Sequence, residues 1–269
     1  MRQLPDHSID ALITDPPYAE VSRDYGRFTE ADWHDLMHQV VEEQQRLLTP
    51  KGSAVYVIQP NSEQVGRMRP WVWDFLSWAS RNYNIVQDAY WWNYATIPSA
   101  NSNTGGLMRP SLKYLVWIGP PDCDRYQDNV LWTPSDWAKA TALSERAMQH
   151  IRQYPSGHTA RHGIMARRCM ERGGSTPFNV LPLPNANSTT GGGAFGHGAS
   201  TPIQLVEWWI RYLTRPGDTI LDPFTGSGTT GIAALTLARN FIGAEKEPAY
   251  YEVARKRLQE AGAQNRLVF

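Results

Sequence analysis

Two short segments near opposite ends of the chain contain residue types that could hold a flat, polar ligand. The first is Thr14-Asp15-Pro16-Pro17-Tyr18, which follows the apolar run IDALI at 9–13. Proline cannot donate to a sheet ladder, so a strand that reaches Pro16 must end there and the chain must turn stiffly. The turn would present a carboxylate, proline carbonyls and one aromatic face in a fixed arrangement. These groups suit hydrogen bonding to, and stacking on, a planar polar molecule.

The second segment is the glycine-rich stretch LDPFTGSGTTG at 221–231. Its glycines have the spacing G-x-G-x-x-G between a predicted strand and a predicted helix, where side chains would block a ligand from approaching the backbone. Glu245 ends the next predicted strand, a position from which a carboxylate can accept the hydroxyl hydrogens of a ribose. The segment therefore predicts binding of a cofactor that contains a nucleoside.

The glycine spacing alone leaves other classes of protein open. An NAD-dependent oxidoreductase satisfies the same pattern, although such domains usually open a chain and this segment closes one. A triphosphate-binding P-loop is disfavoured because no lysine follows GSG. A tight turn without any ligand is the remaining alternative.

Alternating strand and helix patterns predict the elements that position the two segments. Apolar residues recur at helical spacing in 29–48, 72–80, 201–213, 229–238 and 248–262, and strands are predicted at 9–14, 53–58, 84–92, 112–119, 219–222 and 240–245. Thr29 is the predicted N-cap of the first helix, and Thr201 of the third, with Gln204 as its capping-box partner. Strands that alternate with helices predict an α/β sheet.

The middle of the chain has a different character. From about 120 to 200 the periodicity weakens, and TTGGGAFGHGAS at 189–200 predicts a loop, so this region is expected to be an insertion. Between 134 and 176 seven Lys or Arg residues stand against three acids. A solvated surface and a nucleic-acid contact both fit this local excess of positive charge. The candidate phosphate contacts are Arg161, Arg167 and Arg168.

Composition sets outer limits on the class of protein. The 269 residues are 41% hydrophobic and 19% charged, which suits one large domain or one domain with an insertion. The zero formal net charge disfavours a uniformly basic nucleic-acid coat protein. No apolar run is long enough to span a bilayer and no signal-peptide pattern is present, so a cytoplasmic protein without a membrane partner is expected. Cys123 and Cys169 have no partners at metal-ligand spacing, and no metal site is predicted.

Three stretches together resemble a known family. ITDPPY near the start, LDPFTGSGTT near the end and FIGAEKEPAYYEVARKRL after it are similar to the amino-group DNA methyltransferases in their permuted, β-class order. The resemblance implies an α/β, Rossmann-like sheet that binds S-adenosylmethionine, with an inserted target-recognition region. It implies a catalytic half at 1–119, the target-recognition region at 120–200 and a cofactor-binding half at 201–269.

The resemblance also implies roles for single residues. Asp15 and the Pro16 carbonyl would accept hydrogen bonds from the amino group of the target base, Pro17 would complete the turn, and Tyr18 would stack on the flipped base. The expected cofactor-binding residues are Asp222, Phe224, Gly226, Gly228, Glu245 and Thr201. Where the family commonly has Lys-Pro this chain has Thr201-Pro202, which implies only a hydroxyl contact to the methionine carboxylate.

An acid at the first motif position is similar to the N6-adenine members of the family, so N6-adenine methylation of double-stranded DNA is the leading hypothesis. N4-cytosine methylation and a catalytically impaired DNA-binding relative are the alternatives. Family members usually carry a Gly-Asp pair upstream of LPDHSID, which begins at Leu4 here; either the start is truncated or the adenine pocket is completed differently. A homodimer and a cognate restriction endonuclease are partner hypotheses, and the target sequence is not predicted.

Overall fold

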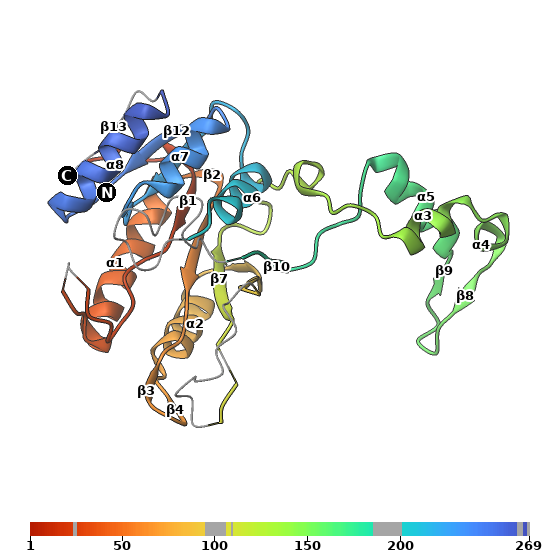
Figure 1. The fold of residues 1–269 in the computed structure, drawn as a ribbon, viewed down its shortest axis with the longest axis horizontal. Helices are drawn as coiled ribbons and strands as arrows, with labels where there is room; N and C mark the ends of the chain where they lie inside the picture. The colour runs from red at the N-terminus through yellow and green to blue at the C-terminus, as the bar shows by residue number, and fades with distance from the viewer. Residues whose placement is uncertain (24–25, 95–105, 109, 185–200, 263–265, 268–269) are drawn as a thin grey trace. The chain divides into compact units, whose positions relative to one another are not determined.

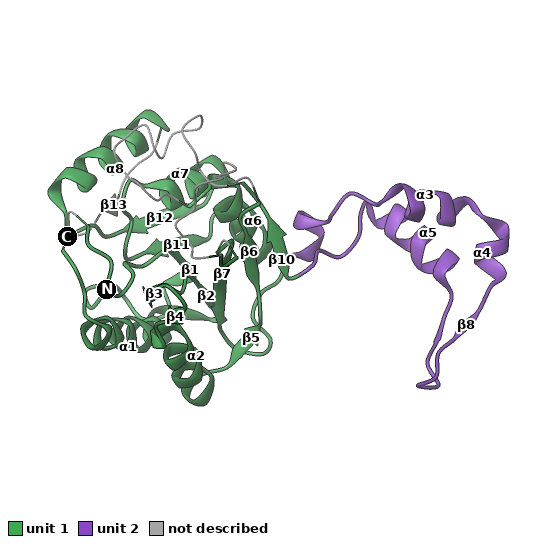
Figure 2. Ribbon diagram, turned by 60° about the horizontal axis from the view of Figure 1, so that its bottom comes forward, with its two compact units in different colours: residues 1–125, 179–269 green, residues 126–178 purple. Residues whose placement is uncertain are grey.

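The computed structural model describes residues 1–23, 26–94, 106–108, 110–184, 201–262 and 266–267 (Figure 1). The chain forms two compact units, which Figure 2 colours separately. Unit 1 comprises Met1–Arg125 and Asn179–Phe269, and unit 2 comprises Tyr126–Phe178. The loop predicted at 189–200 lies outside the described residues.

Unit 1 is built on one nine-stranded sheet. The strand order is β10-β6-β7-β2-β1-β11-β12-β13, and β5 also pairs with β7. The strands are β1 (Ile9–Thr14), β2 (Leu48–Ile58), β5 (Ile85–Gln87), β6 (Tyr90–Trp92), β7 (Leu112–Ile118), β10 (Val180–Pro182), β11 (Thr219–Asp222), β12 (Asn240–Gly243) and β13 (Arg266–Leu267). The helices are α1 (Glu30–Leu47), α2 (Trp71–Asn82), α6 (Ile203–Leu213), α7 (Thr229–Thr236) and α8 (Pro248–Glu260), and β3 (Ser62–Gln64) and β4 (Arg67–Met68) form a separate hairpin.

A strand from the N-terminal part of the chain and one from the C-terminal part pair in the middle of this sheet. β1 is parallel to β2 on one side and to β11 on the other, with Leu12 opposite Leu221. From β1 the chain crosses to β2 through α1, and from β11 it crosses to β12 through α7, so the two crossovers run in opposite directions. Parallel sheets bind ligands at such a switch point, beside the carboxyl ends of the strands. The permuted α/β fold predicted from the sequence is confirmed.

Helices cover both faces of the sheet, with α1 and α2 on one face and α6, α7 and α8 on the other (Figure 2). β7 shows how alternate side chains serve the two layers. Val116 and Ile118 belong to the core cluster that includes α1 and α2 residues. Trp117 points to the opposite layer, where its ring lies 5.4 Å from that of Trp209 on α6. This two-sided burial gives the strand ends a fixed frame.

Most predicted elements of unit 1 are confirmed, with three local corrections. Thr29 caps α1 in a complete capping box with Asp32. The predicted strand at 84–92 is two strands, β5 and β6, and β2 begins at Leu48 rather than at 53. The predicted cap of α6 is wrong, because Pro202 occupies the N-cap position and no side chain caps the helix.

Unit 2 contains short elements that weak periodicity concealed. They are η1 (Gln127–Val130), α3 (Asp136–Leu143), α4 (Glu145–Gln149), the hairpin strands β8 (Arg152–Gln153) and β9 (Thr159–Ala160), and α5 (His162–Arg172). The helices pack through small residues, since Gly163 and Ala166 of α5 are buried. A Cβ at Gly163 would lie 2.5 Å from the backbone nitrogen of Met148. Helices that pack through such small residues need few large apolar residues at helical spacing, and that spacing is the signal by which helices are recognised in a sequence.

Among the described residues, no helix is long and apolar enough to cross a membrane. Within the same residues, no group of three or more His, Cys, Asp or Glu side chains could hold a metal ion.

Candidate active site

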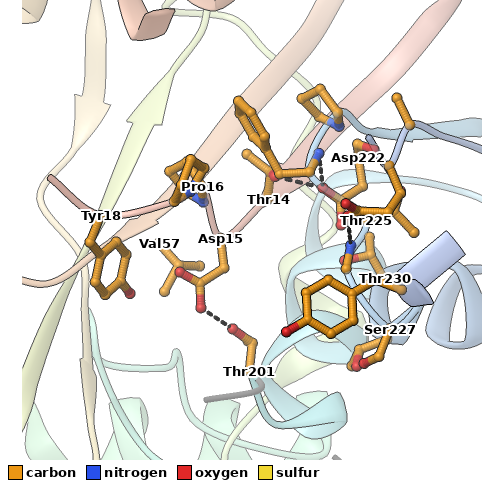
Figure 3. A pocket seen from close by; sticks show the side chains of 18 of the residues that line it. Thr14, Asp15, Pro16, Tyr18, Val57, Thr201, Asp222, Thr225, Ser227 and Thr230 are labelled. Carbon is orange, nitrogen blue, oxygen red and sulfur yellow. Dashed lines mark hydrogen bonds between the residues drawn. The ribbon is translucent and has the colours of Figure 1, made fainter. Parts of the chain in front are cut away.

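A cavity of about 450 Å³ opens where β1 and β11 end. Asp15 follows β1, Asp222 ends β11, and the glycine-rich turn leads from β11 into α7. Figure 3 shows these segments contributing side chains to one space, although they lie about 200 positions apart in the sequence. The adjacency follows from the parallel pairing of β1 with β11, which brings their carboxyl ends to the same edge.

Asp15 is held in place from two directions. The hydroxyl of Thr201 donates to its Oδ2 over 2.6 Å (Figure 3), and the Nζ of Lys113 lies 3.4 Å from the same oxygen. A charged acceptor such as Asp15 forms a stronger hydrogen bond than a neutral one. Thr201 does not cap α6, because Pro202 occupies the N-cap position. Both of these contacts fall on Oδ2, and Asp15 as a whole lines the cavity.

A buried tryptophan holds the double-proline turn in place. The indole Nε1 of Trp33 donates to the Pro17 carbonyl over 2.5 Å, and Trp33 has no exposed surface. Tyr18 follows and lines the cavity, with its ring 6.1 Å from that of Trp71. The turn therefore presents Asp15 and Tyr18 from a rigid base, as the proline pair predicts.

Asp222 is a buried carboxylate in the same cavity. Its Oδ1 accepts from the Thr14 hydroxyl over 2.5 Å and from the backbone N–H of Phe224 over 3.1 Å (Figure 3). Burial raises the pKa of Asp222 to about 6, although these hydrogen bonds act in the opposite direction. The carboxylate is thus ionised at neutral pH but poorly solvated, which makes it a strong acceptor for a ligand donor.

Backbone hydrogen bonds hold the Glu245 carboxylate beside the glycine turn. The N–H of Gly226 donates to Oε2 of Glu245 over 2.8 Å, and the N–H of Glu247 donates to Oε1 over 2.8 Å. Each carboxylate oxygen can accept more than one hydrogen bond, so Glu245 keeps acceptor capacity for a ligand. Gly228 has a φ of +86°, a left-handed conformation that favours glycine, and a Cβ there would lie 3.2 Å from Ala254 of α8.

The structure brings most of the residues singled out from the sequence into this one cavity. Those that line it are Asp15, Pro16, Pro17, Tyr18, Thr201, Asp222, Phe224, Gly226 and Glu245. Gly228 does not line the cavity. Its left-handed conformation turns the chain, and its lack of a side chain allows α8 to pack closely against it. Arg161, Arg167 and Arg168 lie in unit 2, immediately before α5 and on it, and all three are exposed.

Two functional candidates were missed by sequence reasoning. Thr14 binds the buried Asp222, and Lys113 pairs with Asp15. The signal for Lys113 was a single charge inside the otherwise apolar strand β7. Such a charge needs a partner when the strand is buried, and the partner here lies 98 positions away.

Comparison with known proteins identifies the family and the fold. The family model described as DNA methylase, of the N6/N4 methyltransferase type, matches residues 9–256. The type II methyltransferase M.PvuII of Proteus hauseri is 27% identical over 93% of this chain and 78% of its own length. The DNA adenine methyltransferase YhdJ of Escherichia coli (strain K12) is 24% identical over 97% of this chain and 80% of its own.

Solved structures show the same fold. The cytosine-N4-specific PvuII DNA methyltransferase superposes with a TM-score of 0.68 at 21% identity, covering 95% of this chain and 81% of that one. A putative DNA modification methylase of Thermus thermophilus, solved with S-adenosyl-L-methionine, gives 0.60 at 19% identity, covering 99% and 91%. The family match extends from β1 to α8 and so spans both motif segments and the cavity between them. The chain therefore belongs to the N6-adenine/N4-cytosine DNA methylase family, whose members are S-adenosylmethionine-dependent DNA amino-methyltransferases.

Proposed function

We propose that this protein methylates the exocyclic N6 of adenine in double-stranded DNA. The observation that carries the proposal is the position of Asp15, an acid at the end of β1, in one cavity with Asp222 and Glu245. An acceptor for an amino group and a binding site for a nucleoside cofactor would thus share one cavity, which a transfer between the two ligands requires.

The residues around the glycine turn fit S-adenosylmethionine. Glu245, fixed by two backbone amides, would accept the ribose hydroxyls, and Phe224 supplies apolar surface. Asp222 would accept from the methionine ammonium group, for which an ionised buried carboxylate is suited. Thr201 was expected to contact the methionine carboxylate; its hydroxyl hydrogen is already given to Asp15, so we assign it to positioning that residue. When bound, the cofactor supplies a methyl group on a cationic sulfur that leaves as a neutral thioether.

Asp15 would act on the amino nitrogen of the base. The nitrogen lone pair of an aromatic amine is delocalised into the ring, and acceptors on its hydrogens favour a more tetrahedral, nucleophilic nitrogen. Asp15 Oδ1 and the Pro16 carbonyl would supply those two acceptors. The nitrogen must lose one proton as it gains the methyl group, and the Asp15 carboxylate that holds that hydrogen would be its first acceptor. Tyr18 would stack on the flipped base. This contact would offset part of the free energy needed to unstack the base from the duplex, which is roughly a few kcal/mol.

Adenine is favoured over cytosine by the acid at Asp15, whereas the similarity to the cytosine-N4-specific PvuII enzyme favours cytosine as the second candidate. Both bases present an amino group beside an acceptor ring nitrogen, so the mechanism at Asp15 is the same for either. The base identified in the product decides between them.

Unit 2 is the proposed site of DNA backbone contact. Arg161, Arg167 and Arg168 are exposed on and next to α5, and none of them forms an ion pair with a described residue. Arg172 of the same helix, in contrast, is paired with Asp128. Exposed guanidinium groups without carboxylate partners are suited to phosphate oxygens, to which they can donate two parallel hydrogen bonds.

The first experiment is nucleoside mass spectrometry of unmethylated DNA after incubation with the purified protein and S-adenosylmethionine. We expect N6-methyladenine, with the rate reduced by about 100- to 1,000-fold in Asp15→Ala because an acceptor that acts in the transition state is lost. Asp35→Ala is the matched control, since Asp35 is exposed on α1 and lies outside the cavity.

The outcomes separate the alternatives. N4-methylcytosine in place of N6-methyladenine would keep the mechanism and change the base. Absence of any methylated base with the wild-type protein would contradict the proposed function and favour a DNA-binding relative without activity. Equal rates for wild-type and Asp15→Ala would refute the role of Asp15.

A further inference from the structure

Lys113 is the one charged side chain of β7 that enters the active-site cavity. It pairs across the sheet with Trp91 of β6, and its Nζ lies 4.8 Å from the centre of the Trp91 ring and 5.3 Å from that of Tyr18. Only 14% of its side chain is exposed. A lysine held between two aromatic faces and the Asp15 carboxylate is thus fixed at the place where the target base would be bound.

The ammonium group has donor capacity beyond its described contacts. Lysine has three N–H donors and no acceptor, and its carboxylate contact, to Oδ2 of Asp15 over 3.4 Å, uses one of the three. The aromatic faces of Tyr18 and Trp91 attract the charge without replacing hydrogen bonds. At least one N–H therefore remains to bind an acceptor that enters the cavity next to Asp15.

A base that places its amino group on Asp15 brings such an acceptor with it. Adenine carries ring nitrogen N1 beside N6, and cytosine carries N3 beside N4. This nitrogen loses its Watson–Crick partner when the base leaves the duplex, and a buried acceptor without a donor costs about 1–3 kcal/mol. Thr201, the other donor next to Asp15, already gives its hydrogen to that carboxylate.

We propose that Lys113 is a base-reading residue, which donates a hydrogen bond to the ring nitrogen adjacent to the methylated amino group. This inference rests on the proposed function, because it takes an amino-bearing base as the ligand. Lys113 would thereby require an acceptor beside the amino group and reject bases that carry a hydrogen there. The nearby Asp15 carboxylate keeps the pair neutral, so the base edge meets a donor and an acceptor without net charge.

A different reading is that Lys113 only holds Asp15 in position. The two readings are separated by a cycle that combines a protein variant with an altered base. Lys113→Met keeps the length and apolar stem of the side chain but removes its donors, and 1-deazaadenine replaces the ring nitrogen N1 by C–H. 7-Deazaadenine is the matched control base because it alters the ring nitrogen that the proposal does not involve. Lys256→Met, at an exposed position of α8, is the matched control variant.

The cycle is measured as kcat/KM for methyl transfer on a duplex that carries each base at the modified position. We expect either change alone to lower kcat/KM by about 10- to 100-fold, and the two together to lower it no further than one. Losses that multiply, or a Lys113→Met loss that is the same on adenine and 1-deazaadenine, would overturn the proposal in favour of the positioning role. Lys113→Arg, which keeps the donors, should retain the preference for adenine over 1-deazaadenine. Calorimetric affinity for S-adenosylmethionine, unchanged in Lys113→Met, shows that the variant is folded.

A second measurement does not depend on turnover. The binding of 2′-deoxyadenosine and of its 1-deaza analogue is followed by NMR in the presence of S-adenosylhomocysteine. Tighter binding of deoxyadenosine to the wild type, lost in Lys113→Met, supports the inference even if no methyl transfer occurs and the proposed function fails. Methyl transfer without any such discrimination would keep the function and overturn the inference. Absence of nucleoside binding and of methyl transfer would overturn both.

Discussion

The two units of this protein differ in what they bury. Unit 1 buries five large aromatic side chains almost completely, namely Trp33, Trp71, Trp91, Trp117 and Trp209, although its Trp73 and Trp92 are exposed. The buried apolar side chains described in unit 2 are small, among them Val130, Ala142 and Ala166, while its Trp137 is 66% exposed. A small unit buries little of its surface and is correspondingly less stable alone. The large buried core of unit 1 is the frame that a rigid site requires, whereas the exposed arginines of unit 2 fit the DNA contact proposed above.

Unit 1 also contains a buried carboxylate, whereas the carboxylates of the unit 2 ion pairs are exposed. Asp222 is buried in unit 1 at 3% exposure, whereas Asp128 and Asp136 of unit 2 have side chains that are 75% and 98% exposed. Chemistry and binding are thus expected to respond to different changes in the chain. Three predictions test how far the two units are independent.

The largest effect is expected from Gly163→Val. Its Cβ would lie 2.5 Å from the backbone nitrogen of Met148 and against the carbonyl of Ala147, so α5 could not keep its packing on α4. A clash with backbone should destabilise unit 2 by on the order of 3 kcal/mol or more. We expect DNA affinity, measured by fluorescence anisotropy, to fall at least about 10-fold, with calorimetric S-adenosylmethionine affinity unchanged.

The matched control is Ala140→Val, at an exposed position of α3 in the same unit. It should leave both affinities unchanged. If Gly163→Val also abolished cofactor binding, the two units would form one cooperative structure and the comparison would fail.

An intermediate effect is expected from Asp222→Asn, and only on unit 1. Burial raises the pKa of Asp222 to about 6, so the folded protein binds the proton of this group more tightly than the unfolded chain does. The contribution of the protonated Asp222 to the free energy of unfolding is fully present below the usual pKa of 3.8. It is lost as the pH rises through about 6. At about 1.4 kcal/mol per pKa unit, the wild type should lose on the order of 3 kcal/mol more than Asp222→Asn between pH 4 and pH 8.

Urea unfolding without cofactor at several pH values measures this difference. Asp35→Asn, an exposed change on α1, should follow the wild-type curve. Parallel curves for wild type and Asp222→Asn would show that Asp222 is not the group that titrates.

The smallest effect is expected from Arg167→Gln and Arg168→Gln in unit 2. Each phosphate contact contributes about 0.9 to the slope of log affinity against log salt concentration. Each variant should therefore lower the magnitude of that slope by about 1 and weaken binding equally on different DNA sequences. Lys256→Gln on α8 is the control, and a slope unchanged in both arginine variants would remove α5 from the proposed contact surface.

Sequence reasoning succeeded where function depends on local chain geometry. A strand that ends in two prolines, and a strand followed by a glycine turn, are visible in a few consecutive residues. Their order along the chain and their resemblance to a family then predicted the permuted sheet. The confirmed capping box at Thr29 is local in the same sense, since its two partners are three positions apart.

It failed where a contact depends on tertiary register. Thr201 reaches Asp15 across 186 positions, and Lys113 reaches it across 98. Neither contact follows from spacing, because both depend on how β7 and the start of α6 lie over the end of β1. Thr201 accordingly looked like a helix cap, and Lys113 like an ordinary strand residue. In unit 2 the helices were missed because they pack through Gly163 and Ala166 rather than through large apolar residues.

The pairing of β1 with β11 also determines the order in which the molecule can be assembled during synthesis. Asp10 and Thr219, which are hydrogen-bonded across this pair, are separated by 209 positions. At about 5–20 residues per second, the ribosome needs roughly 10 to 40 seconds to produce the second strand after the first. During that time β1 can pair with β2, but its other edge stays open. The centre of the sheet thus closes only after every strand on the β2 side of β1 has been synthesised, and until then the nascent chain exposes an apolar strand edge with which other chains could pair.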